Sequence, residues 1–142
     1  MTASFVIAPL SPNHDRLAFS CGVDPLDRYL QIQATQDIRR RIANCFVATS
    51  ANSNITAGYY RFSAASVPML DLPSETAKRL PRYPVVLAAL IGRLAIDRQY
   101  RGRGLGAALL FDAIARAARA ATATRERKAW TVWSMCWQPK PR

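Results

Sequence analysis

The sequence predicts a single α/β domain, and three neighbouring features lead to this prediction. Residues 85–96 form an almost unbroken apolar run, which is typical of an inner strand covered on both faces. Three glycines, Gly102, Gly104 and Gly106, follow within five residues. An Ala/Leu-rich segment without a helix breaker then continues to Arg119. Strand, glycine turn and helix in this order form a typical α/β unit.

The chain before this unit predicts three further strands and one helix. Residues 5–8 read as a short strand that two prolines stop, and residues 45–49 and 55–62 read as a hairpin with its turn at 52–54. Between the strand at 5–8 and this hairpin, Asp24 can cap a helix that has Pro25 at its first position. Apolar residues recur there at every fourth position and predict one buried helix face: Leu26, Leu30, Ala34, Ile38 and Ile42.

Details of packing also follow from these patterns. Tyr59 and Tyr60 point to opposite faces of their strand, so we expect one in the core and the other at a substrate groove. The last helix is expected to bury one set of residues: Leu105, Ala108, Leu109 and Ile114. Arg116 and Arg119 are expected to face outward or toward the C-terminal end of this helix. Residues 64–84 contain four prolines and predict an ordered loop with a short helix at 74–80.

Composition limits the classes of function. Half of the 142 residues are hydrophobic, so a packed core is expected, but no run is long enough to span a membrane. The N-terminus lacks a signal-peptide pattern, and we expect a cytoplasmic chain. Three cysteines, Cys21, Cys45 and Cys136, with His14 as the one histidine, support neither a disulfide framework nor a metal site.

The net charge of +11 is unevenly distributed. Residues 1–90 carry nine Lys/Arg against six Asp/Glu, whereas residues 91–142 carry eleven against three. This surplus suits a polyanion such as tRNA, although solubility alone remains an alternative. Two basic groups are candidate tRNA contacts or plain solvated surface: Arg39, Arg40 and Arg41, and Lys78, Arg79 and Arg82.

The glycine turn predicts an anion-binding site. Glycines let backbone amides approach a ligand, and the N-terminus of the following helix favours negative charge. Arg103 breaks the dinucleotide-binding pattern, and no Gly-Lys-Ser/Thr closes a Walker loop. A plain turn, or a basic Arg-Gly segment that binds RNA, is the alternative.

The segment Arg101-x-x-Gly104-x-Gly106 resembles the pyrophosphate loop of the GNAT-type N-acetyltransferases. The flanking motifs are similar, in the same order, to one branch of that superfamily, the toxins that acetylate the amino group of aminoacyl-tRNA. These motifs are Phe19-Ser-Cys-Gly22, Leu26-Asp-Arg-Tyr-Leu30, Gln36-Asp37, Gly58-Tyr-Tyr60, Tyr83-Pro84 and Gly92-Arg-Leu-Ala95. The resemblance covers about residues 4–121.

The resemblance implies a mixed, mostly antiparallel sheet flanked by helices, and acetyl-CoA as the acetyl donor. It implies that the backbone at Leu94, Ala95 and Ile96 meets the acetyl carbonyl and pantetheine, with the Ala95 amide as oxyanion donor. It also implies a set of amides that take the pyrophosphate: Arg101, Gly102, Arg103, Gly104, Leu105, Gly106 and Ala107. The implied partners are aminoacyl-tRNA and a ribbon-helix-helix antitoxin, and a homodimer is left open.

The resemblance separates residues 1–121, the acetyltransferase core, from residues 122–142, a divergent, basic and Trp-rich tail. The tail lacks the tyrosine that this family uses as proton donor and the family's C-terminal strands. We expect a short strand at 130–135, and a frameshifted or truncated gene with reduced or lost activity is our hypothesis for the tail. Two functional alternatives remain, namely acetylation of a protein N-terminus or small amine, and a non-enzymatic remnant that binds antitoxin or nucleic acid.

Overall fold

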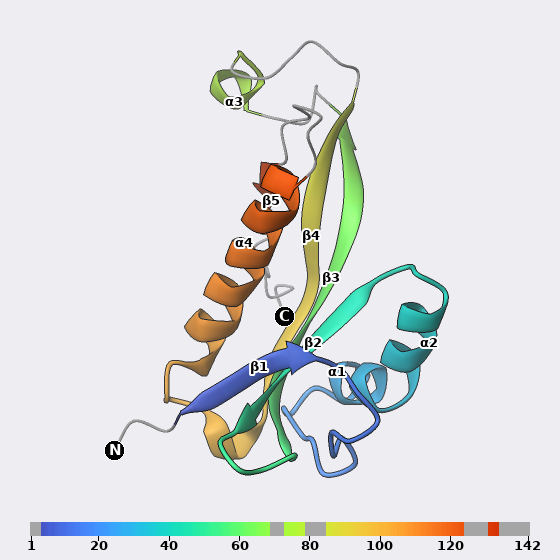
Figure 1. The fold of residues 1–142 in the computed structure, drawn as a ribbon, viewed down its shortest axis with the longest axis vertical. Coiled ribbons are helices and arrows are strands. Elements are labelled where there is room, and N and C mark those ends of the chain that lie inside the picture. The colour runs from blue at the N-terminus through green and yellow to red at the C-terminus, as the bar shows by residue number, and fades with distance from the viewer. Residues whose placement is uncertain (1–3, 69–72, 79–84, 124–130, 134–142) are drawn as a thin grey trace, which may run out of the picture.

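A five-stranded sheet in the order β1-β2-β3-β4-β5 forms the centre of the computed structural model (Figure 1). The structure describes residues 4–68, 73–78, 85–123 and 131–133. The strands are, in chain order, β1 (Phe5–Pro9), β2 (Asn44–Ser50), β3 (Thr56–Pro68), β4 (Val85–Ile96) and β5 (Thr131–Trp133). The first four pair antiparallel, and β5 pairs parallel with β4. The predicted mixed, mostly antiparallel sheet is confirmed.

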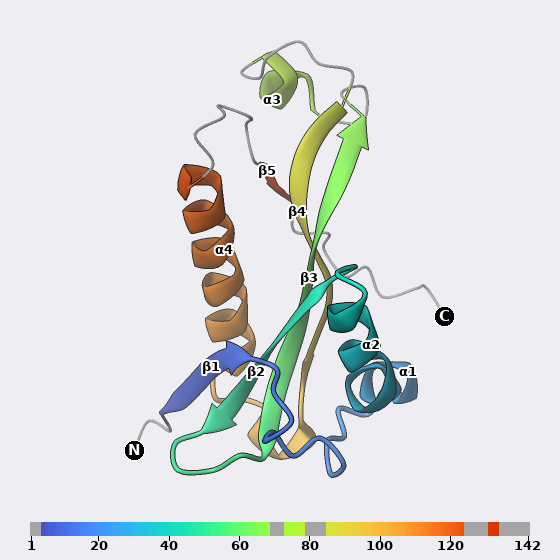
Figure 2. The same ribbon diagram turned by 45° about the vertical axis from the view of Figure 1, so that its right-hand side comes forward.

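Helices cover both faces of this sheet (Figures 1 and 2). On one face lies a helical segment made of α1 (Asp24–Arg28), a π turn η1 (Tyr29–Gln33) and α2 (Ala34–Arg39). On the other face α4 (Leu105–Ala123) lies along β3 and β4. A short helix, α3 (Ser74–Lys78), lies beyond the far end of these two strands. No helix in the described part of the chain is both long and apolar enough to cross a membrane.

The π turn explains the strict four-residue spacing of apolar side chains in the first helical segment. An α-helix repeats every 3.6 residues, so side chains spaced by four gradually move around its surface. The wider π turn brings these side chains back to one face. Leu30 and Ala34 are fully buried. The prediction was wrong at both ends: Val23 is the N-cap residue in place of Asp24, and the segment ends at Arg39, which leaves Ile42 exposed.

Helix α4 buries a different set of residues from the expected one. Its buried residues recur at every fourth position: Leu105, Leu109, Ala113 and Ala117. Ala108 and Ile114 were expected to face inward and are exposed. Arg116 was expected to face outward or toward the C-terminal end of the helix, but it packs over the ring of Phe46 and pairs with Asp112 at 2.8 Å.

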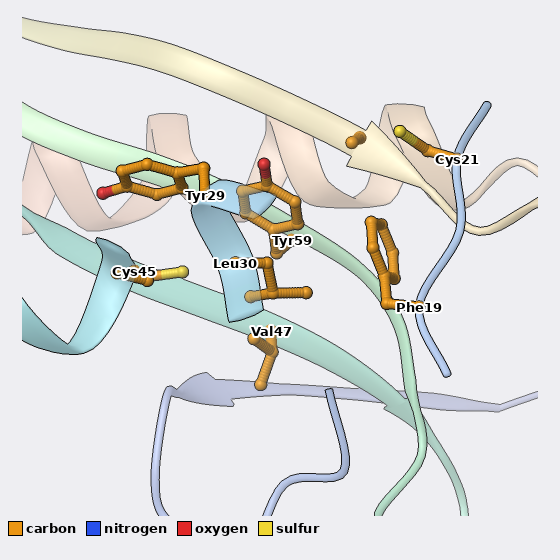
Figure 3. Close-up of a cluster of buried hydrophobic side chains, with 9 residues drawn as sticks. Phe19, Cys21, Tyr29, Leu30, Cys45, Val47 and Tyr59 are labelled. Atoms are coloured by element: carbon orange, nitrogen blue, oxygen red, sulfur yellow. The ribbon is translucent and has the colours of Figure 1, made fainter. Parts of the chain in front are cut away.

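The two adjacent tyrosines of β3 point to opposite faces, and both are fully buried. Tyr59 packs with Leu30 and Phe19 beneath the first helical segment (Figure 3). Tyr60 packs with Leu109 on the α4 face, and its hydroxyl donates to Asp112 at 2.6 Å. The expectation that one of the pair lines a substrate groove is therefore wrong, because each face of the sheet has its own covered core.

We expect Tyr59→Phe to lower the free energy of unfolding by about 1–2 kcal/mol. The Tyr59 hydroxyl donates to the Leu26 carbonyl at 2.7 Å, and phenylalanine leaves that carbonyl without this donor while keeping the ring packing. Urea denaturation of both proteins measures the change. An equal midpoint and slope for both proteins would contradict the assigned hydrogen bond.

Strands β3 and β4 form a long hairpin in place of much of the expected loop. Pairing continues to Pro68 and Val85, so residues 64–68 belong to β3. Helix α3 confirms part of the helix expected at 74–80, and residues 69–72 and 79–84 lie outside the described residues. The end of the expected loop is therefore correct, because β4 begins at Val85, whereas its start is wrong, because β3 continues to Pro68.

A bulge at Gly92 sets which side chains of β4 face which helix. Arg61 pairs with Arg93 and the next residue of β3 pairs with Ile91, so Gly92 has no partner. Such a bulge shifts the side-chain alternation by one residue. Ile91 and Leu94 consequently both pack on the α4 face.

The tail is described only where β5 pairs with residues 88–90 of β4. This strand confirms part of the strand expected at 130–135. The other tail predictions, and Cys136, fall on residues outside the described ranges.

Candidate functional site

The glycine turn joins the end of β4 to the start of α4. A single 3-10 turn, η3 (Arg98–Tyr100), follows the strand, and Asp97 caps it by accepting a hydrogen bond from the Gln99 amide at 2.9 Å. Gly102 and Gly104 both have φ of +75°, a left-handed conformation that side chains with a Cβ atom rarely adopt. Two left-handed glycines turn the chain so that α4 begins at Leu105.

The amides of this turn are available to a ligand. In the described residues the first backbone hydrogen bond into α4 runs from the Ala108 amide to the Gly104 carbonyl at 3.1 Å. The amides of residues 105–107 lie in the first helical turn, which has no intrahelical acceptors for them. Outside the bonds of η3 itself, none of the amides of residues 101–104 donates to a backbone carbonyl of the described residues. Residues 101–107 are the seven positions whose amides, according to the family resemblance, bind the pyrophosphate.

The space above the turn is open. A Cβ atom placed on Gly102, Gly104 or Gly106 would meet no other heavy atom within 4 Å. Arg103 is exposed and its guanidinium lies 5.4 Å from the centre of the Tyr100 ring, so positive charge flanks the turn. Free amides, a helix N-terminus, open space and basic side chains together fit a bound phosphate group. Leu105 is buried and anchors the helix end to the core.

The end of β4 presents a free edge beside this turn. The Asp97 amide donates to the Ala57 carbonyl of β3 at 2.8 Å. Successive residues of a strand direct their amides to opposite edges, so Ala95 also faces β3 whereas Leu94 and Ile96 face away from it. Among the described residues no strand pairs with β4 beyond Leu90 on that outer edge. The three predicted residues are thus brought together with the glycine turn, but their amides point in different directions.

A groove of about 800 Å³ opens on the other face of the sheet, between the first helical segment and β4. It is lined by Asp24, Pro25, Asp27, Arg28, Tyr29, Gln31, Ile32, Gln33 and Arg93. The Arg93 guanidinium lies 4.2 Å from the centre of the Tyr29 ring. Arg93 is the neighbour of Leu94 in the chain, so the groove reaches the strand segment that the sequence assigned to the acetyl group.

Behind the groove lies a polar network that the sequence analysis did not assign. The Tyr29 hydroxyl donates to the Asp37 carboxylate at 2.9 Å and accepts from Arg61 Nε at 3.1 Å. Gln33 donates to the other oxygen of Asp37 at 3.1 Å, and Arg61 lies 3.5 Å from the carboxylate. The π turn brings Tyr29 and Gln33 to the same carboxylate. The strict four-residue apolar spacing was the signal in the sequence that could have indicated this turn.

Burial and hydrogen bonding shift the pKa values of this network. Burial by itself raises the pKa of Asp37, but hydrogen bonds from Gln33 and Tyr29 and the Arg61 charge outweigh it, so that pKa lies below its ordinary value. Burial first, and then the hydrogen bond to Asp37, raise the pKa of Tyr29 to about 12. At neutral pH the carboxylate is therefore ionised and the tyrosine is protonated, as the observed hydrogen bonds require.

The described cysteine and histidine side chains form neither an activated nucleophile nor a metal site. Burial raises the pKa of the Cys45 thiol to about 12 and also raises that of Cys21, so neither is activated. Burial and nearby Arg16 lower the pKa of His14, whose Nδ1 accepts the Ser11 amide at 3.0 Å. The described residues contain no group of three or more His, Cys, Asp or Glu side chains that could hold a metal ion.

Comparison with known proteins identifies relatives over most of the chain. It is 32% identical over 117 residues to a probable toxin TacT from Sinorhizobium fredii, a match that covers 82% of this chain and 65% of that protein. It is 36% identical over 113 residues to a tRNA-acetylating toxin from Mycobacterium tuberculosis, covering 79% and 65%. The chain therefore spans just under two thirds of the length of these curated relatives. No protein-family model matches it.

Solved structures of toxins share the fold. A KacT mutant superposes with a TM-score of 0.83 at 24% identity, covering 96% of this chain and 80% of that one. AtaT in complex with acetyl-methionyl-tRNA gives 0.79 at 23% identity, covering 96% and 81%. An AtaT mutant bound to acetyl-CoA and the C-terminus of the antitoxin AtaR gives 0.69 at 23% identity, covering 84% and 69%. At these identities the likeness establishes the fold.

Proposed function

We propose that this chain is an acetyl-CoA-dependent N-acetyltransferase of aminoacyl-tRNA, because its matched residues and its fold are similar to those of acetyltransferase toxins. The observation that carries the proposal is the glycine turn. Its amides open α4 next to the outer edge of β4, with which no strand of the described residues pairs beyond Leu90. A diphosphate and an extended thioester arm need these two features side by side.

The amides of residues 101–107 are proposed to hold the pyrophosphate of the coenzyme. Acetyl-CoA would supply the acetyl group as an activated thioester. Gly102 and Gly104 let the backbone approach the phosphates because neither has a side chain of its own, and a Cβ atom at either position would meet no described atom within 4 Å. The N-terminus of α4 and the guanidinium of Arg103 favour the negative charge.

The outer edge of β4 is proposed to bind the thioester arm by strand-like pairing. Leu94 and Ile96 direct their amides to that edge, so one of these amides, in preference to that of Ala95, is the better placed donor to the acetyl carbonyl. A preorganised amide of this kind stabilises developing negative charge by about 2.7–4 kcal/mol.

The groove beside Arg93 is proposed to admit the acceptor, with the charged amino group near Asp24 and Asp27 and phosphates near Arg28 and Arg93. A free α-amino group has a pKa of about 7.7–8.0 and esterification to tRNA lowers it, so at neutral pH a reactive uncharged fraction of the bound amine exists without a strong base. The enzyme would then act mainly by holding amine and thioester in line, which needs no histidine.

Protein and RNA partners follow from the same proposal. Arg39, Arg40 and Arg41 are exposed at the end of α2 and Lys78 is exposed on α3, so both are available to a tRNA backbone, whereas Arg79 and Arg82 lie outside the described residues. We propose a ribbon-helix-helix antitoxin as the protein partner and the cytoplasm as the location, and a homodimer remains an expectation.

Transfer of label from acetyl-CoA tests the proposed reaction. The protein is incubated with radiolabelled acetyl-CoA and with one of three acceptors: charged tRNA, the same tRNA after deacylation, or a pool of peptides with free N-termini. We expect label only on charged tRNA. Label on peptides alone would favour the other acetyltransferase function, and binding of tRNA without transfer would favour a non-enzymatic remnant.

We expect Arg93→Ala to reduce kcat/KM for charged tRNA about tenfold while leaving coenzyme A affinity unchanged. The guanidinium lines the groove, and the opposite face of the sheet carries α4. Steady-state kinetics and calorimetry measure the two quantities. Arg119→Ala removes the same charge from an exposed position on α4 and serves as the matched control. Equal losses in both variants would show a general charge effect and contradict the groove assignment.

A further inference from the structure

A short turn formed by residues 19–22 lies against η3, 77 residues further along the chain, and two hydrogen bonds join them. The Arg98 amide donates to the Ser20 carbonyl at 2.9 Å. The Ser20 amide donates to the Asp97 carboxylate at 3.0 Å. We call residues 19–22 the N-terminal turn.

Asp97 joins three segments of the fold at once. One carboxylate oxygen accepts from Ser20 and the other from Gln99, while its own amide donates to Ala57. The residue is only 8% exposed although it carries a charge. A buried carboxylate that is satisfied entirely by backbone amides fixes the backbone around it.

Arg101 makes the second connection. As the first residue of the glycine turn it was expected to contribute to phosphate binding, but its guanidinium donates to the Cys21 carbonyl. It also lies 3.4 Å from where a Cβ atom of Gly22 would be, and Gly22 has φ of +93°. The left-handed glycine therefore leaves room for the arginine.

The N-terminal turn continues directly into the acceptor groove. The Cys21 amide donates to the Asp27 carboxylate at 2.9 Å, and Asp27 lines that groove. A chain of hydrogen bonds thus runs from the glycine turn through Arg101 and Cys21 to the groove. It connects the two surfaces that must hold the two substrates at a fixed separation.

We propose that Asp97 and Arg101 are positioning residues that clamp the glycine turn to the N-terminal turn, and so set the geometry of the coenzyme site relative to the acceptor groove. This inference rests on the proposed function, because the clamped amides are those assigned to the pyrophosphate. Neither side chain needs to touch the coenzyme to act.

The direction in which Asp97→Asn changes the affinity for coenzyme A tests the clamp. Removal of a negative charge near a polyanion would tighten coenzyme A binding if only electrostatics mattered. Positioning predicts the opposite, because asparagine cannot accept both amides. We expect coenzyme A affinity to fall about tenfold by calorimetry. Unchanged or tighter binding would overturn the proposal.

Salt dependence tests Arg101 in the same assay. If Arg101→Ala weakened binding by loss of a phosphate contact, the difference from the wild-type protein would shrink at 1 M salt, where charges are screened over about 3 Å. We expect a similar fold-change in coenzyme A affinity at low and at high salt. A difference that disappears at high salt would assign Arg101 to the phosphate and overturn its role in the clamp.

Hydrogen exchange of the ligand-free proteins separates the clamp from the proposed function. We expect Asp97→Asn to speed exchange of the hydrogen-bonded amides of residues 19–21 and 98–100 together, with no change in β1 and β2. Unchanged exchange would overturn the clamp whether or not coenzyme A binds. Wild-type protein that fails to bind coenzyme A would overturn the proposed function, and exchange would still decide on the clamp.

Discussion

Gly104→Val is expected to weaken coenzyme A binding by about 100-fold or more while the protein stays folded. A valine side chain would project into the open space that we assign to the pyrophosphate, where its Cβ atom would meet no described atom within 4 Å apart from the neighbouring residues. It would block the amides without displacing any part of the core. The left-handed φ of +75° adds about 1–2 kcal/mol of backbone strain, a cost that a folded domain tolerates. Calorimetry with coenzyme A and thermal unfolding measure the two effects.

Asn52→Val is the matched control for that strain. Asn52 has φ of +63° and is exposed in the turn between β2 and β3, so valine there suffers a similar backbone penalty far from the glycine turn. We expect a comparable loss of stability and an unchanged affinity for coenzyme A. If both variants lost affinity equally, the effect would come from general destabilisation, and the turn would no longer be assigned to the phosphate.

The glycine turn and its neighbours were predictable because their signals are local. An apolar run followed by closely spaced glycines predicts strand, turn and helix without knowledge of distant contacts, and the bounds of β4 agree with the predicted run. The hairpin at residues 45–62 was predictable for the same reason. Which residues sit at the turn could therefore be read from the sequence.

The acceptor side was not predictable because it depends on pairing between distant segments. The bulge at Gly92 decides which way the side chains of β4 point, and a bulge is fixed by the register with β3. The contact of Arg61 with Asp37 joins β3 to α2, and Arg101 bonds to Cys21 across 80 positions of sequence. No periodicity within one segment encodes such contacts, so the groove, the network behind it and the clamp required the structure.

Asp37→Ala is expected to lower the free energy of unfolding by about 3 kcal/mol and to reduce acceptor use. The Asp37 carboxylate is the acceptor for Tyr29 and Gln33 and the ionic partner of Arg61. Its removal leaves a buried hydroxyl and a largely buried guanidinium without their partner, which costs more than the pair contributes when intact. Tyr29 also supports Arg93 at the groove, so kcat/KM for charged tRNA should fall while coenzyme A affinity stays constant.

Asp37→Asn separates the charge from the hydrogen bonds. Asparagine keeps one acceptor oxygen for Tyr29 but loses the attraction to Arg61, so its loss of stability at pH 7 should be smaller than that of the alanine variant. Because the folded-state pKa of Asp37 lies below its ordinary value, the ionised carboxylate stabilises the wild-type protein above about pH 4. That contribution is lost as the pH falls through the lowered pKa. Denaturation curves at several acidic pH values should therefore show the gap between wild type and Asp37→Asn closing below about pH 4, and a gap independent of pH would mean that the charge of Asp37 contributes nothing to the fold.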